Sequence, residues 1–358
     1  MNTKMKIAVI GAGYFGITIA STLAKDNLVD LYEKNSDILM AGSDVNQCRV
    51  HRGYHYPRSD ETVQELLNAN ESFRIEFEGA IMNSTDNYYA IAKKDSSTSA
   101  SEYLKFCQRN NLNYTLSQPS ILDDESIDLC VKVKENLFDH KKIKKICWEK
   151  LQTSGVNMLL NTEAKKEDFD KYDLVIICTY GDWGLLLDKN TELKQDFQFE
   201  VCEKVFVKLP PNFKNISLLV MDGPFMSIDP VGETGMFIIG DVVHTVRQRK
   251  IGKSPAIDPK YLPYINKGIL SNVPISNYKL FIESASKFMP ELQNAEYVGS
   301  SFCVKTTLSN VDKTDKRPTV INQINKKIIT VFSGKIPTCV STAQEISKIV
   351  YNTSKNNF

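Results

Sequence analysis

The sequence has little of several features that mark common functional classes. Its formal net charge is +1, with 44 lysines and arginines against 43 acidic residues in 358. No overall field therefore favours nucleic acid or an anionic membrane as a partner. No apolar run is long enough to span a bilayer, and no internal repeat is present. We expect no nucleic-acid partner and no transmembrane segment.

Metal-binding patterns are also lacking. The eight cysteines include no Cys-x-x-Cys pair and no metal-like spacing. Scattered single cysteines in a long chain indicate a reducing compartment, so we predict a cytoplasmic protein without a metal site. Histidine is scarcer still, with four in the chain. Two of the four, His51 and His55, lie in the basic segment "VNQCRVHRGYHYPRSDET", residues 45–62.

The first forty residues carry a motif with a physical rationale. In order they give an apolar strand, a glycine turn, a helical pattern, a second strand and an acid: residues 7–10, Gly11-x-Gly13-x-x-Gly16, 17–24, 29–32 and Glu33. The glycines permit a tight turn, a close approach by a pyrophosphate and close helix packing. Glu33 can accept bonds from the ribose hydroxyls and would repel a 2′-phosphate. The pattern predicts a dinucleotide site for NAD or FAD at Gly11, Gly13, Tyr14, Phe15, Gly16, Glu33 and Lys34.

Later segments indicate the fold class. Residues 174–178 form an uninterrupted apolar strand, and residues 326–352 read as strand, glycine turn and helix, both typical of a covered parallel sheet. Between them, residues 186–300 alternate in the manner of an antiparallel sheet, with a helix predicted over 274–292. We predict an α/β protein in which a Rossmann-like nucleotide domain, with a parallel sheet, carries an inserted α+β domain with an antiparallel sheet.

The predicted domains are discontinuous in sequence. The nucleotide domain comprises residues 1–78, 131–186 and 300–358, and the substrate domain comprises residues 79–130 and 187–299. A second Gly-x-Gly-x-x-Gly is absent, which argues against an enzyme with both a flavin and a nicotinamide domain.

At this level the chain resembles FAD-dependent oxidoreductases of the D-amino-acid oxidase superfamily over essentially its full length. Members share the N-terminal motif, a middle strand ending in a Thr-x-Gly turn and a final glycine turn, here Thr179-Tyr180-Gly181 and Ser333-Gly334-Lys335. The basic segment is similar to that of L-2-hydroxyglutarate oxidases at Asn46, Val50, His51, Gly53 and Tyr56. It departs from that family at Arg49 and Arg52, and the final turn reads "SGKIPTC" in place of a fuller glycine run. The substrate of that family therefore cannot be assigned to this chain.

The resemblance implies FAD as cofactor, with further contacts from Asn46, Gln47, Thr179, Gly181, Ser333, Gly334, Lys335 and Ile336. His51 is the candidate catalytic base, because a neutral histidine can accept a hydroxyl proton. The alternative is a histidine that orients the flavin ring or carries it covalently. Lys335 could stabilise negative charge on reduced flavin or remain a surface lysine. Arg317 lies in a segment that the superfamily often uses near its substrate.

The arginines beside this site suggest an anionic substrate, because a guanidinium can hold a carboxylate through two bonds. Candidate substrate-binding residues are Arg49, Arg52, Tyr56, His244 and Arg247. We predict a flavoprotein that oxidises a small 2-hydroxy acid, amino acid or amine by hydride transfer, with oxygen or another electron acceptor. The alternatives are a flavoprotein of another reaction type, such as a sugar-nucleotide mutase or a hydroxylase, and a non-catalytic subunit. The oligomeric state stays open.

Overall fold

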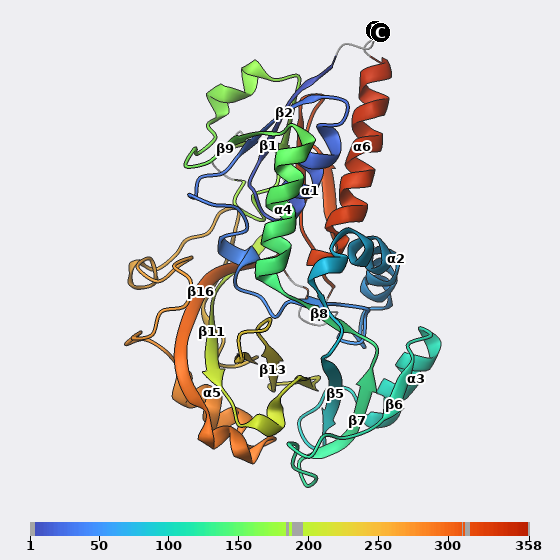
Figure 1. Ribbon diagram of the computed structural model, residues 1–358, viewed down its shortest axis with the longest axis vertical. Coiled ribbons are helices and arrows are strands. Elements are labelled where there is room, and N and C mark those ends of the chain that lie inside the picture. The colour runs from blue at the N-terminus through green and yellow to red at the C-terminus, as the bar shows by residue number, and fades with distance from the viewer. Residues whose placement is uncertain (1–3, 184–185, 188–195, 310, 312–315, 357–358) are drawn as a thin grey trace.

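Two sheets dominate the protein, whose structure is a computed structural model describing residues 4–183, 186–187, 196–309, 311 and 316–356. Within these residues, one sheet has six strands and is mostly parallel, and the other has nine and is mostly antiparallel (Figure 1). The predicted fold class is confirmed.

The six-stranded sheet joins strands from the beginning, middle and end of the sequence. Its order is β17 (Val320–Gln323), β18 (Ile328–Phe332), β10 (Leu174–Ile177), β1 (Lys6–Ile10), β2 (Leu28–Tyr32) and β9 (Asn157–Leu159). Only β17 runs antiparallel to its neighbour within this described sheet. In register, Ile7 pairs with Leu174 on one side and Val29 on the other, which places β1 near the centre.

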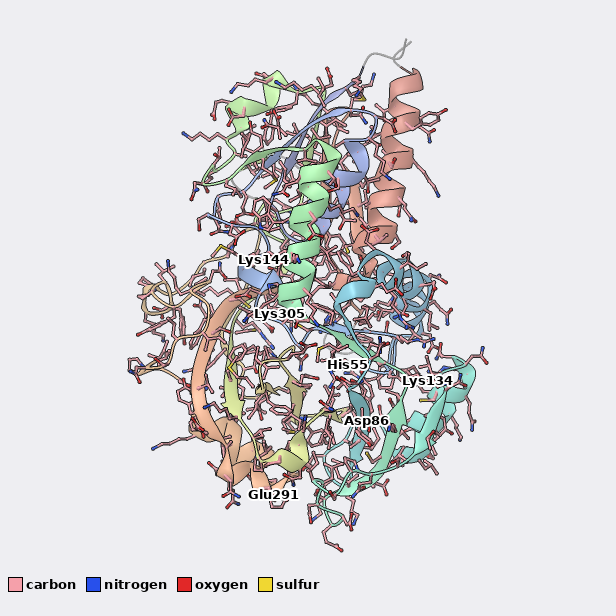
Figure 2. All side chains as sticks on the ribbon, in the orientation of Figure 1. His55, Asp86, Lys134, Lys144, Glu291 and Lys305 are labelled. Carbon is pink, nitrogen blue, oxygen red and sulfur yellow. The ribbon has the colours of Figure 1, made fainter. Side chains whose placement is uncertain are left out.

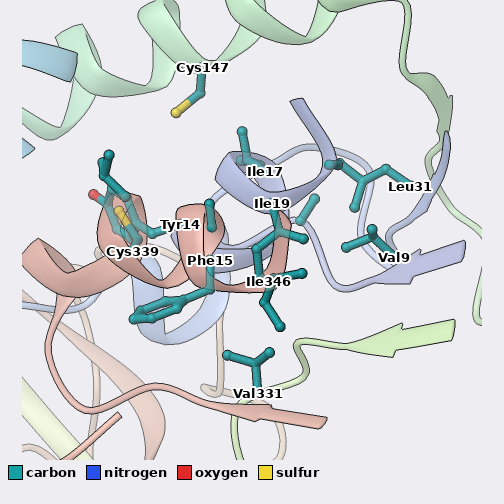
Figure 3. Packing of buried hydrophobic residues seen from close by; sticks show 14 of the residues in the cluster. Val9, Tyr14, Phe15, Ile17, Ile19, Leu31, Cys147, Val331, Cys339 and Ile346 are labelled. Atoms are coloured by element: carbon teal, nitrogen blue, oxygen red, sulfur yellow. The ribbon is translucent and has the colours of Figure 1, made fainter. Parts of the chain in front are cut away.

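Both faces of this sheet are buried. Helices α1 (Tyr14–Leu23), α4 (His140–Ser154) and α6 (Cys339–Asn356) cover one face (Figure 1). Figure 3 shows Val9 and Val331 from the strands packing with Ile346 of α6. On the other face, Ile10 and Ile177 pack with Trp183. Alternate residues of each strand thus enter different cores, which explains why the strands read as continuous apolar runs.

Local signals set the helix ends. Asp139 accepts hydrogen bonds from the N–H groups of Lys141 and Lys142 and so caps α4, and Gly155 ends it at a φ of 77°. Ser59 caps α2 (Asp60–Glu76) by accepting from Thr62 N–H. These ends agree with the sequence patterns.

The larger sheet has the order β15 (Val246–Gly252), β11 (Phe197–Lys208), β14 (Met236–Asp241), β13 (Met226–Pro230), β12 (Ile216–Met221), β5 (Asp86–Ala92), β7 (Ile127–Val133) and β6 (Tyr114–Leu116). The long β16 (Glu296–Leu308) also pairs with β11. Residues of α3 (Ala100–Arg109) and α5 (Tyr278–Ala285) pack against this sheet. A three-stranded sheet, β3 (Arg49–Val50), β8 (Asn136–Phe138) and β4 (Ile81–Met82), lies between the large ones (Figure 1).

Two sequence-based boundaries need comment. The helix predicted over 274–292 is wrong in extent, because α5 spans only Tyr278–Ala285 and a 3-10 turn begins at Pro290. Proline cannot continue a helix, and it disfavours helical backbone at the residue before it. Strand β16 remains in the larger sheet up to Leu308, beyond the predicted boundary at 300. The two-domain division stays a proposal. Among the described residues, no helix combines the length and apolarity needed to cross a membrane.

Candidate nucleotide site and adjoining cavity

A cavity of about 960 Å³ opens where the carboxyl ends of β1, β2 and β10 meet the larger sheet. In an open α/β sheet, ligands bind outside these strand ends. Figure 2 labels two of the lining residues, His55 and Lys305, at mid-height between the two large sheets. The glycine motif and the basic segment therefore line one continuous space.

The glycine turn is shaped for close approach. Gly11 has a φ of 100°, and a Cβ there would lie 2.9 Å from the carbonyl oxygen of Cys178. A Cβ on Gly16 would lie 1.8 Å from the carbonyl oxygen of Gly11, so this glycine lets α1 pack on the turn. Gly13 instead borders the cavity at the N-cap of α1, where a Cβ would meet only the Ser43 hydroxyl, at 3.2 Å. A helix N-terminus facing a cavity suits a phosphate, so the turn fits the pyrophosphate of FAD.

Glu33 lies beside this turn and also holds it together. One carboxylate oxygen accepts from the Ala12 N–H at 2.8 Å, and the other accepts from the Asn35 backbone at 2.9 Å and from its side-chain amide at 2.6 Å. These bonds orient the carboxylate at the cavity wall, where its remaining lone pairs can accept hydrogen bonds from ribose hydroxyl groups. Asn35 was not predicted as part of the site, since its role depends on the folded turn.

The other predicted cofactor contacts also reach the cavity. Gly181 and Gly334 permit close chain crossings, because a Cβ on either would lie 2.3 Å from Thr306 Cγ2 or 2.1 Å from the Arg317 carbonyl oxygen, respectively. The cavity is also lined by the remaining predicted contacts: Tyr14, Phe15, Lys34, Asn46, Gln47, Thr179, Ser333, Lys335 and Ile336. Gly16 alone of the predicted set does not line it, because it lies behind the turn.

His51 lies in the cavity wall and is almost fully buried. Its Nδ1 is 3.5 Å from a carboxylate oxygen of Glu135, and its ring is edge-on to the rings of His55 and Tyr56. Burial lowers the pKa of His51 below its ordinary value, although Glu135 opposes that shift. The imidazole is therefore neutral at pH 7 and able to accept a proton. The sequence did not indicate Glu135, which reaches His51 only in the fold.

Arg49 takes part in a buried charge network. Its guanidinium lies 2.7 Å from Asp229 and 3.7 Å from Glu135, and all three side chains are fully buried. Glu135 accepts a further bond from the Tyr89 hydroxyl, and Asp229 accepts one from Ser217. Burial opposes the charged form of Arg49, but Asp229, Tyr89 and Glu135 together outweigh it and raise the pKa of the guanidinium. In place of the predicted substrate contact, we propose that Arg49 positions the two carboxylates.

Replacing Arg49 by methionine should lower the free energy of unfolding by about 3–5 kcal/mol, because two buried carboxylates would lose their common cation. Arg109→Met is the matched control. Arg109 pairs with Asp60 at 2.9 Å, but both side chains are about half exposed, so its loss should cost at most about 1 kcal/mol. Urea unfolding of both variants measures the difference. Equal losses would contradict the network's role.

Tyr56, Lys335 and Arg317 come together on another part of the wall. Lys335 Nζ lies 4.9 Å from the centre of the Tyr56 ring, within range of a cation–π contact. The Arg317 guanidinium donates to the carbonyl of Lys316 at 2.9 Å. All three residues line the cavity, which is compatible with their predicted roles, and those roles stay as proposals.

The structure does not place Arg52, His244 or Arg247 at the cavity. The Arg52 side chain donates to the Lys134 carbonyl at 3.3 Å, and the His244 ring faces Phe281. Arg247 forms an ion pair with Glu203. Glu203 faces away from the cavity because alternate residues of β11 point to opposite sides of the sheet. These three residues therefore lie outside the cavity lining, and a role for them in substrate binding stays a prediction.

Comparisons with known proteins agree with this architecture. No protein-family model matches the chain. A curated relative, FAD-dependent monooxygenase FPY4 of Fusarium mangiferae, is 23% identical over 362 residues, covering 96% of this chain and 90% of the relative. Glycine oxidase from Geobacillus kaustophilus is similar in structure, with a TM-score of 0.71 at 14% identity, covering 98% of this chain and 95% of that one.

L-α-glycerophosphate oxidase from Mycoplasma pneumoniae, solved with FAD bound, superposes with a TM-score of 0.70 at 14% identity, covering 98% of this chain and 95% of that one. The chain therefore has the fold of D-amino-acid oxidase and glycine oxidase. The resemblance inferred from the sequence is confirmed at the level of the fold.

Proposed function

We propose that the protein is an FAD-dependent oxidase or dehydrogenase that oxidises a small anionic molecule, a 2-hydroxy acid, an amino acid or an amine. One observation carries the proposal: the nucleotide turn and the residues His51, Tyr56 and Lys335 line the same cavity. The relatives are named as oxidases or a monooxygenase, and FAD appears in two of the three descriptions. This class and cofactor agree with those expected from the sequence.

Each part of the cavity has a task in such a reaction. The glycine turn and Glu33 would hold the pyrophosphate and ribose of FAD. FAD supplies the hydride acceptor, at its ring N5. His51 Nε2 would accept a hydroxyl proton from an alcohol substrate, while Glu135 near Nδ1 orients the ring. Lys335 would offer positive charge to a developing anion.

The test begins with the visible spectrum of the purified protein, which should show bound oxidised flavin. Under anaerobic conditions, a panel of 2-hydroxy acids, amino acids and amines is then added without nicotinamide. Bleaching by a member of the panel supports the proposal. A protein that never binds FAD would exclude both the oxidase and any other flavin-dependent activity.

A monooxygenase is the second candidate, because the curated relative FPY4 carries that name. Its signature would be flavin bleaching by a nicotinamide cofactor and incorporation of oxygen into the product. The sequence has no second Gly-x-Gly-x-x-Gly to bind a nicotinamide cofactor, which favours the first candidate.

A cytoplasmic location is also part of the proposal, since all eight cysteines are free thiols.

A further inference from the structure

Lys204 differs from most other cations of the cavity wall. Arg49 pairs with Asp229, Arg58 pairs with Asp222, and Lys305 pairs with Glu200. Among the described residues, the Lys204 ammonium has no hydrogen bond or ion pair, although the residue lies in β11, between neighbouring strands, and is only partly exposed. Burial lowers the pKa of its ammonium. A charged group placed there without a partner needs an explanation.

Three polar groups converge beside Lys204, above Gly240 of β14. A Cβ on Gly240 would lie 2.7 Å from Ser227 Oγ, 3.1 Å from Gln47 Nε2 and 3.1 Å from Lys204 Nζ. The missing side chain at Gly240 therefore lets these three groups come together. All four residues line the cavity, and the part of the wall that they form is called the recess below. Gln47 comes from the basic segment, so the recess connects that segment to the larger sheet.

The recess is rich in hydrogen-bond donors. Gln47 Nε2 donates to Ser227 Oγ at 2.5 Å, so the serine oxygen is an acceptor there and its own O–H remains to donate. The Lys204 ammonium adds up to three donors. The nearby carboxylate of Asp229 contacts Arg49 and Ser217 through Oδ1, and it favours the charged form of Lys204 without a hydrogen bond or ion pair to it. The group that completes such a recess is an oxyanion.

We infer that Lys204 and Ser227 bind the carboxylate of the substrate. This inference rests on the proposed function and narrows it to carboxylate-bearing substrates, amino acids or 2-hydroxy acids, in preference to simple amines. Lys204 is then a substrate-binding residue, while His51, in the same cavity, accepts the proton of the hydroxyl group on the carbon that is oxidised.

The test uses propionate and propionamide as probes, because they share a shape, differ in charge and have no amino or hydroxyl group to oxidise. Ligand-detected NMR titration of the FAD-loaded protein gives both affinities. Lys204→Met should weaken propionate binding by about tenfold or more and leave propionamide unchanged, since a hydrogen bond to a charged group is lost. Ser227→Ala should weaken propionate binding by a smaller factor.

Lys208→Met is the matched control. Lys208 lies four positions further along β11, is exposed and pairs with Glu296 at 3.0 Å, so its loss should change neither affinity. Propionate affinity that is unchanged in Lys204→Met would overturn the inference, as would an equal loss of both probes. The visible spectrum keeps the two ideas apart. A flavin-loaded protein with no Lys204 effect refutes this inference alone, whereas a protein without flavin refutes the proposed function.

Discussion

Gly13→Leu is expected to give a folded but colourless protein. Gly13 has a φ of −80°, which any residue can adopt, so a side chain there imposes no backbone strain. Its one close neighbour is the hydroxyl of Ser43, and the remaining space is the cavity itself. A leucine would occupy the space that the pyrophosphate of FAD needs. The flavin content after purification and the far-ultraviolet circular dichroism measure the two parts of this result.

Gly252→Leu provides the control for this experiment. Gly252 ends the strand β15 away from the cavity, and the nearest atom to a Cβ there is a backbone oxygen at 3.8 Å. This variant should keep a normal flavin content. If Gly13→Leu also keeps its flavin, the nucleotide does not lie on the glycine turn.

His51→Ala is expected to slow flavin reduction by a 2-hydroxy acid by about a hundredfold or more, the usual size of a general-base contribution. The wild-type rate should hold from neutral pH to below pH 6.5, because burial lowers the pKa of His51. It should fall only when the pH drops through that lowered value and the imidazole becomes protonated. Anaerobic stopped-flow measurement of reduction across this pH range provides both results.

Flavin content should stay normal in His51→Ala, since we propose that Gly11, Gly13 and Glu33 hold the other end of the cofactor. His244→Ala is the matched control, because that histidine lies outside the cavity. An amine substrate would change the outcome. A neutral amine has no hydroxyl proton and can transfer a hydride without a protein base, so the loss of rate in His51→Ala would then be small. An unchanged rate with a 2-hydroxy acid would leave His51 as a residue that packs against the flavin ring or orients it.

The elements that local patterns encode were predicted well. The glycine motif, the apolar strand of β10 and the alternation of β11 follow from periods of a few residues, and the structure agrees with each. The residues predicted to contact the cofactor accordingly line one cavity, with one exception. Gly16 is the exception, because a glycine needed for helix packing has the same sequence signal as one that borders a ligand.

The part of the cavity that we propose holds the substrate was harder to predict, because it depends on contacts between segments that are distant in the sequence. Arg49 was expected to meet a substrate, but its partner is Asp229, a carboxylate in an apolar strand far along the chain. Lys204 gave no signal of its own, since a lysine in an alternating strand usually faces solvent. The acid inside "SIDP", Asp229, was a better indicator of the buried ion pair, because a buried carboxylate requires a cation. That indicator names the need for a partner but not which of the arginines supplies it.

The order of strands in the six-stranded sheet has a consequence for how the chain is made. Strand β10 is paired on one side by β18, and α6 covers α1, so the sheet around the glycine turn is completed by residues about 320 positions later in the sequence. A nascent chain that has emerged from the ribosome only through the larger sheet would carry an open strand edge and an uncovered apolar helix face. We therefore expect the cofactor to be captured only after β18 and α6 have emerged and packed, and truncations that remove these two elements to aggregate rather than to yield a smaller flavoprotein.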